Sequence, residues 1–434
     1  MAANVENLGT LERRVSMRVP VQDIEKQVDA RLKQLARNVK MPGFRPGKVP
    51  MKIVAQTYGP QVRNEVLGDA VQKSFSEVVK EANLRVAGYP KIEKKDGAGA
   101  EALEFSATFE IYPEVKPGDL SAATLEQPKV AVDDAAVSRT IEVLRKQRTK
   151  FVAAERPAQD GDRLTVDFNG TIDGVPFDGG TAQNFVFALG AGSMLPEFDA
   201  AARGMSAGES KRFGLRFPAD YHGKDVAGKE AQFEVHVRNV DEPRLPEIDA
   251  EFAKSLGVAD GDVEKMRGEI RANVEREVKK RVDARIKNQA MEALLATTPL
   301  VVPKALVEME AQQLVQRAAQ DLQGRGLKPE QLNLNPQQFE ESAKRRVALG
   351  LIIAELARVE NLQPKPAEVR ALVEQEAQSY ESPAEVVKWF YMQPQRLSEM
   401  EAMALEANVV KWVLSKAKVQ EREMAFDELM GASS

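Results

Sequence analysis

The chain reads Asn184-Phe185-Val186-Phe187-Ala188-Leu189 near its middle, with a large apolar side chain at every second position. Because successive side chains of a strand point to opposite faces of a sheet, this stretch predicts a strand with one buried face. The same alternation, with glycine-containing turns between, recurs in Arg163 to Phe168, Glu209 to Phe217 and Glu230 to Val240. With one short helix near Pro196 to Arg203, this part of the chain is predicted to be a small β-rich domain.

Six short blocks occur in order around these strands: Asp160-Gly161-Asp162, Val166-Asp167-Phe168-Asn169-Gly170, Pro176-Phe177-Asp178, Phe185-Val186-Phe187-Ala188-Leu189-Gly190, Met194-Leu195-Pro196-Glu197-Phe198 and Phe217-Pro218-Ala219-Asp220-Tyr221. From about Phe151 to Asp241, this series resembles the FKBP-type peptidyl-prolyl isomerases. Six ordered blocks are a far more specific signal than one motif. The resemblance implies isomerase activity without a cofactor.

Rotation about a peptidyl-prolyl bond faces a barrier of about 20 kcal/mol, since the planar amide must lose its conjugation. A dry aromatic pocket that does not solvate the polarised amide favours the twisted state, so no nucleophile is needed. The resemblance assigns such a pocket to nine positions: Phe168, Phe177, Asp178, Phe187, Met194, Leu195, Phe198, Tyr221 and Phe233. Asp178 and the Tyr221 hydroxyl are the expected polar contacts, and Leu195 is the expected backbone contact.

Two positions depart from the pattern of many FKBP-type isomerases. Phe198 stands where many have a tryptophan at the pocket floor, and Phe168 stands where a tyrosine hydroxyl is common. Both changes keep an aromatic wall and remove polar groups, so we expect proline binding with broad sequence tolerance. The alternative is that these aromatics form only the core of the β-rich domain.

A second signal lies nearer the start, where residues 41–50 read Met-Pro-Gly-Phe-Arg-Pro-Gly-Lys-Val-Pro. Between residues 31 and 52 there are seven basic side chains and no acid, although the formal net charge of the chain is -5: Arg31, Lys33, Arg37, Lys40, Arg45, Lys48 and Lys52. Glycine and proline shape an exposed turn there. An aromatic ring beside Arg and Lys on such a turn suits docking to structured nucleic acid and its bound proteins.

The segment Gly43-Phe44-Arg45-Pro46-Gly47-Lys48 resembles the ribosome-docking signature of the trigger factor family, and the resemblance covers essentially the whole chain. It implies a bacterial chaperone that docks at the ribosomal peptide exit through rRNA and ribosomal protein. Its other partners would be nascent and unfolded polypeptides, with no membrane partner; a homodimer of the free protein is left open. A helix connector that is polar only because loops are polar is the alternative for the segment itself.

The domain organisation predicted from these patterns has an α+β multidomain fold. Residues 1–112 form an α+β ribosome-binding domain, 113–150 a connector that packs with the C-terminal domain, 151–243 the FKBP-like domain and 244–434 a helical chaperone domain with arms. The first domain should have strands at Leu11 to Val19 and Glu104 to Ile111 and a helix over 21–40. A break at Gly59-Pro60 should precede a longer helix from about Gln61 to Asn83.

The C-terminal region should be almost purely helical, with six or so helices broken at Pro303, 324–326, Pro336, 364–366, Pro383 and Pro394. In its first long helix the apolar positions fall at intervals of 3, 4, 4, 4, 4 and 4 residues: Val263, Met266, Ile270, Val274, Val278, Val282 and Ile286. Each four-residue step overshoots a full turn by about 40°, so this stripe winds around the helix. We therefore expect different neighbours along its length, or a partly uncovered arm that offers apolar surface, instead of a two-stranded coiled coil.

Composition excludes several functional classes. The chain has no cysteine and two histidines, so disulfides and thiolate metal sites are excluded and a zinc or iron site is not expected. It has no GxxxxGK[ST] phosphate loop, and no cofactor is expected. The longest apolar stretch, 347–357, is too short to cross a bilayer, and residues 1–14 lack the apolar core of a secretory signal. These features favour a cytoplasmic protein.

The leading hypothesis is an ATP-independent chaperone that docks on the ribosome and isomerises prolyl bonds. One alternative is a stand-alone FKBP-type isomerase on a helical dimerisation module, in which residues 1–112 are dispensable for role and location. The other is a nucleic-acid-binding factor with an inactive middle domain, which predicts equal affinity for naked RNA and whole ribosomes. The short length of the basic stretch and the acidic remainder argue against the second alternative.

Overall fold

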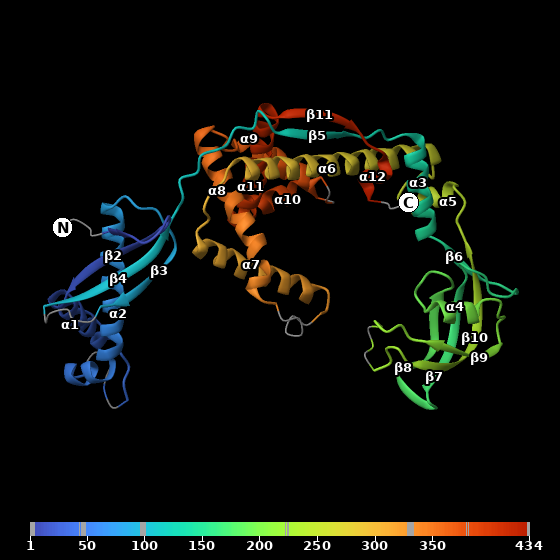
Figure 1. Ribbon diagram of the computed structural model, residues 1–434, viewed down its shortest axis with the longest axis horizontal. Helices are drawn as coiled ribbons and strands as arrows, with labels where there is room; N and C mark the ends of the chain where they lie inside the picture. Colours follow the sequence, from blue (N-terminus) through green and yellow to red (C-terminus); the bar gives the residue numbers. More distant parts are fainter. Residues whose placement is uncertain are drawn as a thin grey trace. The chain divides into compact units, whose positions relative to one another are not determined.

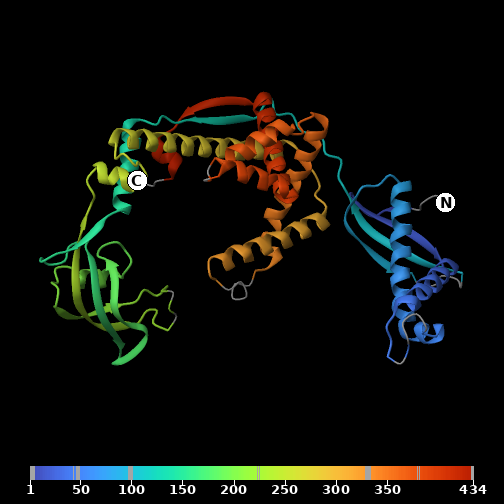
Figure 2. The same ribbon diagram turned by 180° about the vertical axis from the view of Figure 1, so that it is seen from behind.

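The computed structural model describes residues 5–42, 44, 49–95, 101–221, 223, 225–327, 334–378, 380 and 382–431. The chain divides into two compact units. Figures 1 and 2 show its elements from opposite sides. The first unit comprises residues 1–127 and 283–422, and the second comprises residues 128–282 and 423–434.

The N-terminal part of the first unit is an antiparallel sheet packed against two helices (Figure 1). In the order β1-β2-β4-β3, the sheet contains β1 (Val5–Asn7), β2 (Glu12–Pro20), β4 (Ala102–Ile111) and β3 (Val86–Lys94). The helices are α1 (Val21–Asn38) and α2 (Met51–Glu81). Buried side chains recur every four residues along α1, at Ile24, Val28, Leu32 and Ala36, which fixes the face that packs on the sheet.

The expected break at Gly59-Pro60 is wrong, because α2 continues through Pro60. Proline removes one backbone N–H but does not by itself end a helix whose apolar face remains buried on both sides of it. Val54 before Pro60 and Val62 and Val66 after it are all buried in the same core. The two expected strands are confirmed as β2 and β4, whereas β3 was not predicted.

The rest of the first unit is mainly helical. It contains α7 (Lys304–Gly324), a 3-10 turn η2 (Pro336–Phe339), α8 (Glu340–Val359), α9 (Pro366–Ala377), α10 (Pro383–Met392) and α11 (Pro394–Lys416). Three of these helices begin on the prolines that the sequence marked as breaks, because proline at the first helical position loses no hydrogen bond. The purely helical expectation needs one correction: β11 (Lys418–Glu423) pairs with β5 (Thr124–Lys129).

The second unit contains the β-rich domain. Its strands are β6 (Lys150–Ala153), β7 (Arg163–Ile172), β8 (Val175–Ala188), β9 (Ser210–Arg216) and β10 (Glu230–Arg244), with α4 (Pro196–Ala202) between β8 and β9. The antiparallel order is β6-β10-β7-β8, and β9 also pairs with β10. All four expected strands and the short helix are present, and β8 begins earlier than predicted.

The second unit also holds α3 (Asp134–Gln147), α5 (Ala250–Ser255), α12 (Phe426–Met430) and the first part of α6 (Val263–Thr297). Asp133 caps α3 by accepting a hydrogen bond from the Ala136 N–H at 2.8 Å. The helix α6 packs against different neighbours along its length, although most of its winding stripe lies in one core. Met266 to Val278 pack with Val137 and Ile141 of α3, whereas Ala290 to Leu294 belong to a different core, in the first unit, with residues of α8 and α11.

Candidate functional site

The β-rich domain encloses a cavity of about 480 Å³. Its lining includes eight of the nine positions that the sequence assigned to a proline pocket: Phe168, Phe177, Asp178, Met194, Leu195, Phe198, Tyr221 and Phe233. These residues are up to 65 positions apart in the sequence, as Phe168 and Phe233 are, and the fold brings them together. The structure thus gathers eight of the nine predicted positions around one cavity.

Aromatic rings in edge-to-face contact form the floor and walls of this cavity. The Phe198 ring is 1% exposed and lies 5.7 Å from the Phe168 ring and 5.9 Å from the Phe233 ring, measured between centroids. Phe177 lies 6.0 Å from Phe233 at 79°. Such contacts match the positive ring edge to the negative ring face and fix the rings relative to one another. The cavity therefore has rigid apolar walls.

Three antiparallel strands deliver the rings from the same face of the sheet. Phe168 on β7 pairs in register with Val235 on β10, and Phe233 lies two residues earlier on β10, so both rings point to one side. Two glycines make room for them. A Cβ on Gly170 would lie 2.6 Å from the Phe233 ring, and a Cβ on Gly180 would lie 2.9 Å from the Phe177 ring. Any larger residue at these two positions would push a ring into the cavity.

The polar groups lie at the mouth. Asp178 is exposed, and Tyr221 is half-buried with its ring 4.9 Å from that of Phe217. Gly192 and Ser193 form an exposed rim next to Met194. An extended peptide has room to enter from solvent with a proline ring pointing into the cavity. The amide before that proline would then lie beside the Asp178 carboxylate and the Tyr221 hydroxyl.

One predicted position does not line the cavity. Phe187 is 5% exposed and packs behind the floor, with its ring 5.8 Å from that of Phe198. Sequence reasoning missed Leu215, Phe217 and Val226, which do line it. The sequence signal for two of them was present, because Leu215 and Phe217 belong to the alternating stretch from Glu209 to Phe217.

Two carboxylates stabilise the frame around the cavity. Asp162 is 1% exposed and accepts hydrogen bonds from Arg156 at 2.7 Å and from the Gln159 N–H at 2.8 Å. Burial alone would raise the pKa of Asp162, but these two donors hold it below its usual value. Asp167 accepts from Arg238 at 2.7 Å and from the Asn184 N–H at 2.8 Å, and the Arg238 hydrogen bond lowers its pKa. The Asp167 interactions tie strands β7, β8 and β10 together, whereas the Asp162 interactions hold the segment between β6 and β7.

The basic segment near the N-terminus is described in part. Gly43, Arg45, Pro46, Gly47 and Lys48 lie outside the described residues. Phe44 is described: it is 37% exposed, and its N–H donates to the Met41 carbonyl at 3.1 Å. Lys33 and Arg37 on α1 and Lys40 just after it are exposed, and Arg31 pairs with Glu65 at 2.6 Å. The described part of the segment therefore presents an aromatic ring and several cations to solvent.

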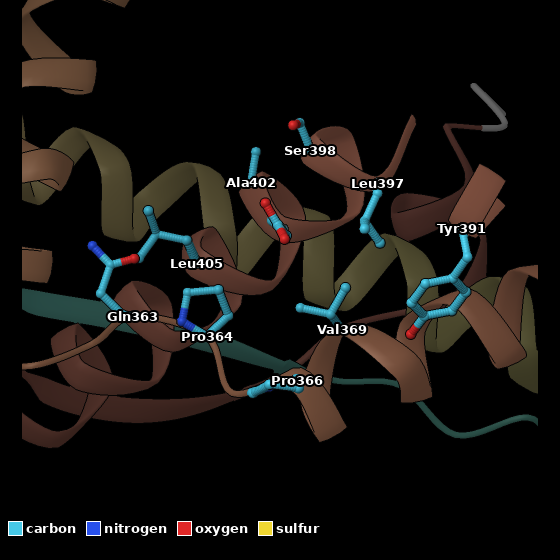
Figure 3. A pocket seen from close by; sticks show the side chains of 10 residues that line it. Gln363, Pro364, Pro366, Val369, Tyr391, Leu397, Ser398, Ala402 and Leu405 are labelled. Atoms are coloured by element: carbon cyan, nitrogen blue, oxygen red, sulfur yellow. The ribbon is translucent and has the colours of Figure 1, made fainter. Parts of the chain in front are cut away.

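A second cavity, of about 550 Å³, lies among α9, α10 and α11 (Figure 3). Its lining combines apolar side chains with a carboxylate: Gln363, Pro364, Pro366, Val369, Tyr391, Leu397, Ser398, Glu401, Ala402 and Leu405. Only Val369 is buried, while Tyr391 is 46% exposed. This is an open apolar surface with a charged edge.

In the described part of the chain, neither a metal-binding cluster of side chains nor a membrane-spanning helix is present. No group of three His, Cys, Asp or Glu side chains there could hold a metal ion. Within the same residues, no helix has both the length and the apolar character to cross a membrane.

Comparisons with protein families match nearly the whole chain. The family described as "Bacterial trigger factor protein (TF)" matches residues 1–144, and its C-terminal counterpart matches residues 262–415. The family described as "FKBP-type peptidyl-prolyl cis-trans isomerase" matches residues 154–238, which contain most of the cavity described above.

Curated relatives agree with these matches. The chain is 58% identical to the trigger factor of Azoarcus sp. (strain BH72), covering 97% of this chain and 96% of the relative. It is 55% identical to the trigger factor of Aromatoleum aromaticum (strain DSM 19018 / LMG 30748 / EbN1), covering 99% of both. A solved structure described as "Promiscuous Substrate Recognition in Folding and Assembly Activities of the Trigger Factor Chaperone" aligns with a TM-score of 0.47 at 19% identity, over 95% of this chain and 99% of that one. The assignment rests on the sequence relatives and the family matches: the chain belongs to the trigger factor family.

Proposed function

We propose that this chain, a chaperone with an FKBP-type peptidyl-prolyl isomerase domain, docks at the ribosomal peptide exit, shelters nascent segments and isomerises their prolyl bonds in the cytoplasm. The observation that carries the isomerase part is the aromatic cavity of the β-rich domain. We assign docking to residues 1–112 and isomerisation to residues 151–243. Residues 244–434, with the connector 113–150, are assigned to the holding of nascent segments.

In the proposed reaction, the cavity binds the proline ring and leaves the preceding amide at its mouth. Phe168, Phe198 and Phe233 exclude water from the ring, so the amide loses the solvation that stabilises its charge-separated planar form. The twisted amide is less polarised and suffers less from this loss. Asp178 and Tyr221 hold the substrate backbone at the mouth, and the bond rotates without any covalent step.

Phe187 has a supporting role in this proposal. It lies behind Phe198 and holds that ring in place, so a change there should act through the floor of the cavity. Met194 and Leu195 close the opposite rim, where the segment before α4 passes the mouth.

Docking is assigned to Gly43, Phe44, Arg45, Pro46, Gly47 and Lys48, supported by the exposed cations of α1. Contacts between these cations and rRNA phosphates would release counterions, so ribosome binding should weaken steeply with salt. The exposed Phe44 ring supplies an apolar contact for a ribosomal protein.

Holding is assigned to the open surface among α9, α10 and α11 (Figure 3). A chaperone that works without ATP needs contacts that are weak, numerous and exchangeable. Half-exposed side chains such as Tyr391 and Leu405 provide such contacts. Nascent and unfolded chains with apolar segments are the proposed clients.

The docking assignment is tested by cosedimentation with ribosomes at low and high salt. Changing Phe44, Arg45 and Lys48 together to Ala should reduce binding at low salt at least tenfold. The matched control changes another exposed aromatic with two exposed bases of the same domain, Tyr89, Lys91 and Lys94, to Ala, and should bind as the parent does. Equal binding by the parent and the first variant would refute the assignment, as would binding that is indifferent to salt.

The isomerase assignment is tested with a short peptide that contains one prolyl bond. The intact chain should accelerate the cis/trans exchange of this peptide. Phe177→Ala removes one aromatic ring from the cavity wall and should lower kcat/KM at least tenfold. Val175→Ala, on the same strand but 65% exposed, is the control and should have no effect. Normal exchange catalysis by the Phe177 variant would show that the cavity is not the site.

A further inference from the structure

Asp199 is a buried carboxylate beside the cavity that the proposed reaction does not use. It lies on α4, directly after the floor residue Phe198, and is 8% exposed. Its Oδ2 accepts a hydrogen bond from the Gly190 N–H at 3.2 Å. Its Oδ1 is buried and has no hydrogen-bond partner among the described residues. A buried acceptor left unpaired is unfavourable, so its retention here calls for a functional explanation.

Two hydrogen bonds of Asp199 reach the two ends of one segment, while its carbonyl accepts from the Arg203 N–H at 2.9 Å. The side chain holds the N–H of Gly190, and the backbone N–H of Asp199 donates to the carbonyl of Leu195 at 3.1 Å. Between these two ends lie Gly192, Ser193 and Met194, which together with Leu195 form one rim of the cavity. Position 190 requires glycine, since its φ is +78° and a Cβ there would lie 2.8 Å from Asp160 Oδ1.

We propose, resting on the isomerase function proposed above, that Asp199 is a positioning residue, which holds the segment from Gly190 to Leu195 so that Met194 and Leu195 close on the proline ring. It does not touch the substrate itself. With the side-chain bond removed, the start of the segment loses its anchor, while the end remains tied by the backbone of α4. The rim should then sample open positions, and the ring should be bound less often in the productive arrangement.

The groups around Asp199 affect its pKa and therefore the stability of the domain. Burial raises its pKa; the Gly190 N–H and Arg203 oppose that rise, while Asp160, which itself pairs with Arg203 at 2.5 Å, adds to it. A carboxylate whose pKa is raised on folding is ionised at a cost to stability at neutral pH, and that cost disappears once acid protonates it. Removing the charge should therefore not destabilise the domain, even where it impairs the site.

The test compares Asp199→Ala, Asp199→Asn and Glu197→Ala in the full chain. Asp199→Ala should lower kcat/KM for a prolyl peptide about tenfold, mainly through KM, without lowering the thermal midpoint of the domain. Asp199→Asn keeps an acceptor for the Gly190 N–H and should retain at least half of the activity. Glu197, an exposed acid of the same helix, is the matched control and should have no effect. Parental activity of Asp199→Ala would overturn the proposal, as would losses of activity and thermal midpoint that go together.

A second readout separates this proposal from the isomerase function itself. In NMR spectra of the full chain, the Gly190 amide and the Met194 methyl signals should shift in Asp199→Ala, shift much less in Asp199→Asn and stay unchanged in Glu197→Ala. If the parent chain catalysed no isomerisation, the proposed function would fail, and these signals would still report on the rim. If the signals did not move in Asp199→Ala, the positioning role would fail while the isomerase function could stand.

Discussion

Two cavities of similar volume, about 480 Å³ in the β-rich domain and about 550 Å³ among the C-terminal helices, are built in opposite ways. Six of the fifteen residues that line the first are buried, and three of these six, Phe168, Leu215 and Phe233, lie on strands β7, β9 and β10 of one sheet. One of the ten that line the second is buried. The first is enclosed by fixed rings, and the second is an open surface.

In the function proposed above, this difference lets one chain combine catalysis with holding. Lowering a rotation barrier requires an arrangement that is already in place before the substrate arrives, and edge-to-face rings provide it. Holding many unrelated clients requires contacts that form and break easily, and half-exposed side chains on helices provide them. The comparison therefore predicts that single changes act strongly in the first cavity and weakly in the second.

The largest effect is expected at the floor of the enclosed cavity. Phe198→Ala removes a ring that is 1% exposed, so it should cost the domain about 3–5 kcal/mol of stability and abolish isomerase activity. Phe198→Leu keeps more of the volume and should leave the domain folded with kcat/KM at least tenfold lower. Circular dichroism melts and peptide exchange rates measure both. Full activity of the leucine variant would contradict the role of the aromatic floor.

A smaller effect is expected from a single hydroxyl at the mouth. Tyr221→Phe keeps the ring and removes one hydrogen-bonding group, which is worth about 1 kcal/mol, so kcat/KM should fall about fivefold. The thermal midpoint should change little. Tyr89→Phe, at a position that is 85% exposed on the N-terminal sheet, serves as the control. An unchanged kcat/KM in Tyr221→Phe would show that the Tyr221 hydroxyl has no role in the proposed site.

The rigid frame of the enclosed cavity should depend on pH through Asp162. Its pKa is lowered on folding, so its stabilising contribution is present above the ordinary aspartate pKa of about 3.9 and is lost as the pH falls through the lower folded value. At pH 7, Asp162→Asn should lower the thermal midpoint of the domain by about 5 °C. That difference should shrink steadily as the pH falls below about 4. A difference that is constant with pH would show that ionisation of Asp162 does not stabilise the frame.

The smallest effect is expected at the open surface. Tyr391→Ala removes one half-exposed ring from a surface with many alternative contacts, so retention of an unfolded client should change by less than about twofold. Isomerase activity on a short peptide should not change. Tyr380→Ala, also about half exposed but outside the cavity lining, is the matched control. A tenfold loss in Tyr391→Ala alone would mean that this surface works as a specific pocket.

Sequence alone predicted the parts of the molecule that depend on local pattern. The period-2 alternation located β7, β9 and β10, and the prolines at 366, 383 and 394 located the starts of three helices. It failed where packing overrides a local signal. Pro60 stays inside α2 because the apolar face around it remains buried. The strand β11 was not predicted because it forms by pairing with β5, which lies almost 300 residues earlier in the chain.

The candidate site was predicted in a similar way. The ordered blocks and the resemblance that they carry identified eight lining positions, of which Phe233 lies outside the blocks. They placed Phe187 in the lining, whereas its ring packs behind Phe198. Alternation predicts which face of the sheet a side chain takes, but not whether another side chain lies between it and the cavity. Asp199 escaped notice for a related reason: nothing in its neighbourhood of the sequence shows that Gly190 folds back onto it.

The central claim is that the enclosed cavity binds proline specifically while the helical surface binds without that requirement. Methionine-methyl NMR of the intact chain tests it directly, because Met194 lies in the rim of the first cavity and Met392, which is 78% exposed, follows Tyr391 of the second. Titration with an apolar peptide that contains proline should shift the Met194 signal, and the same peptide with alanine in place of proline should not, while Met392 should respond alike to both. A Met194 signal that ignores the proline peptide, or responds equally to the alanine peptide, would contradict the account.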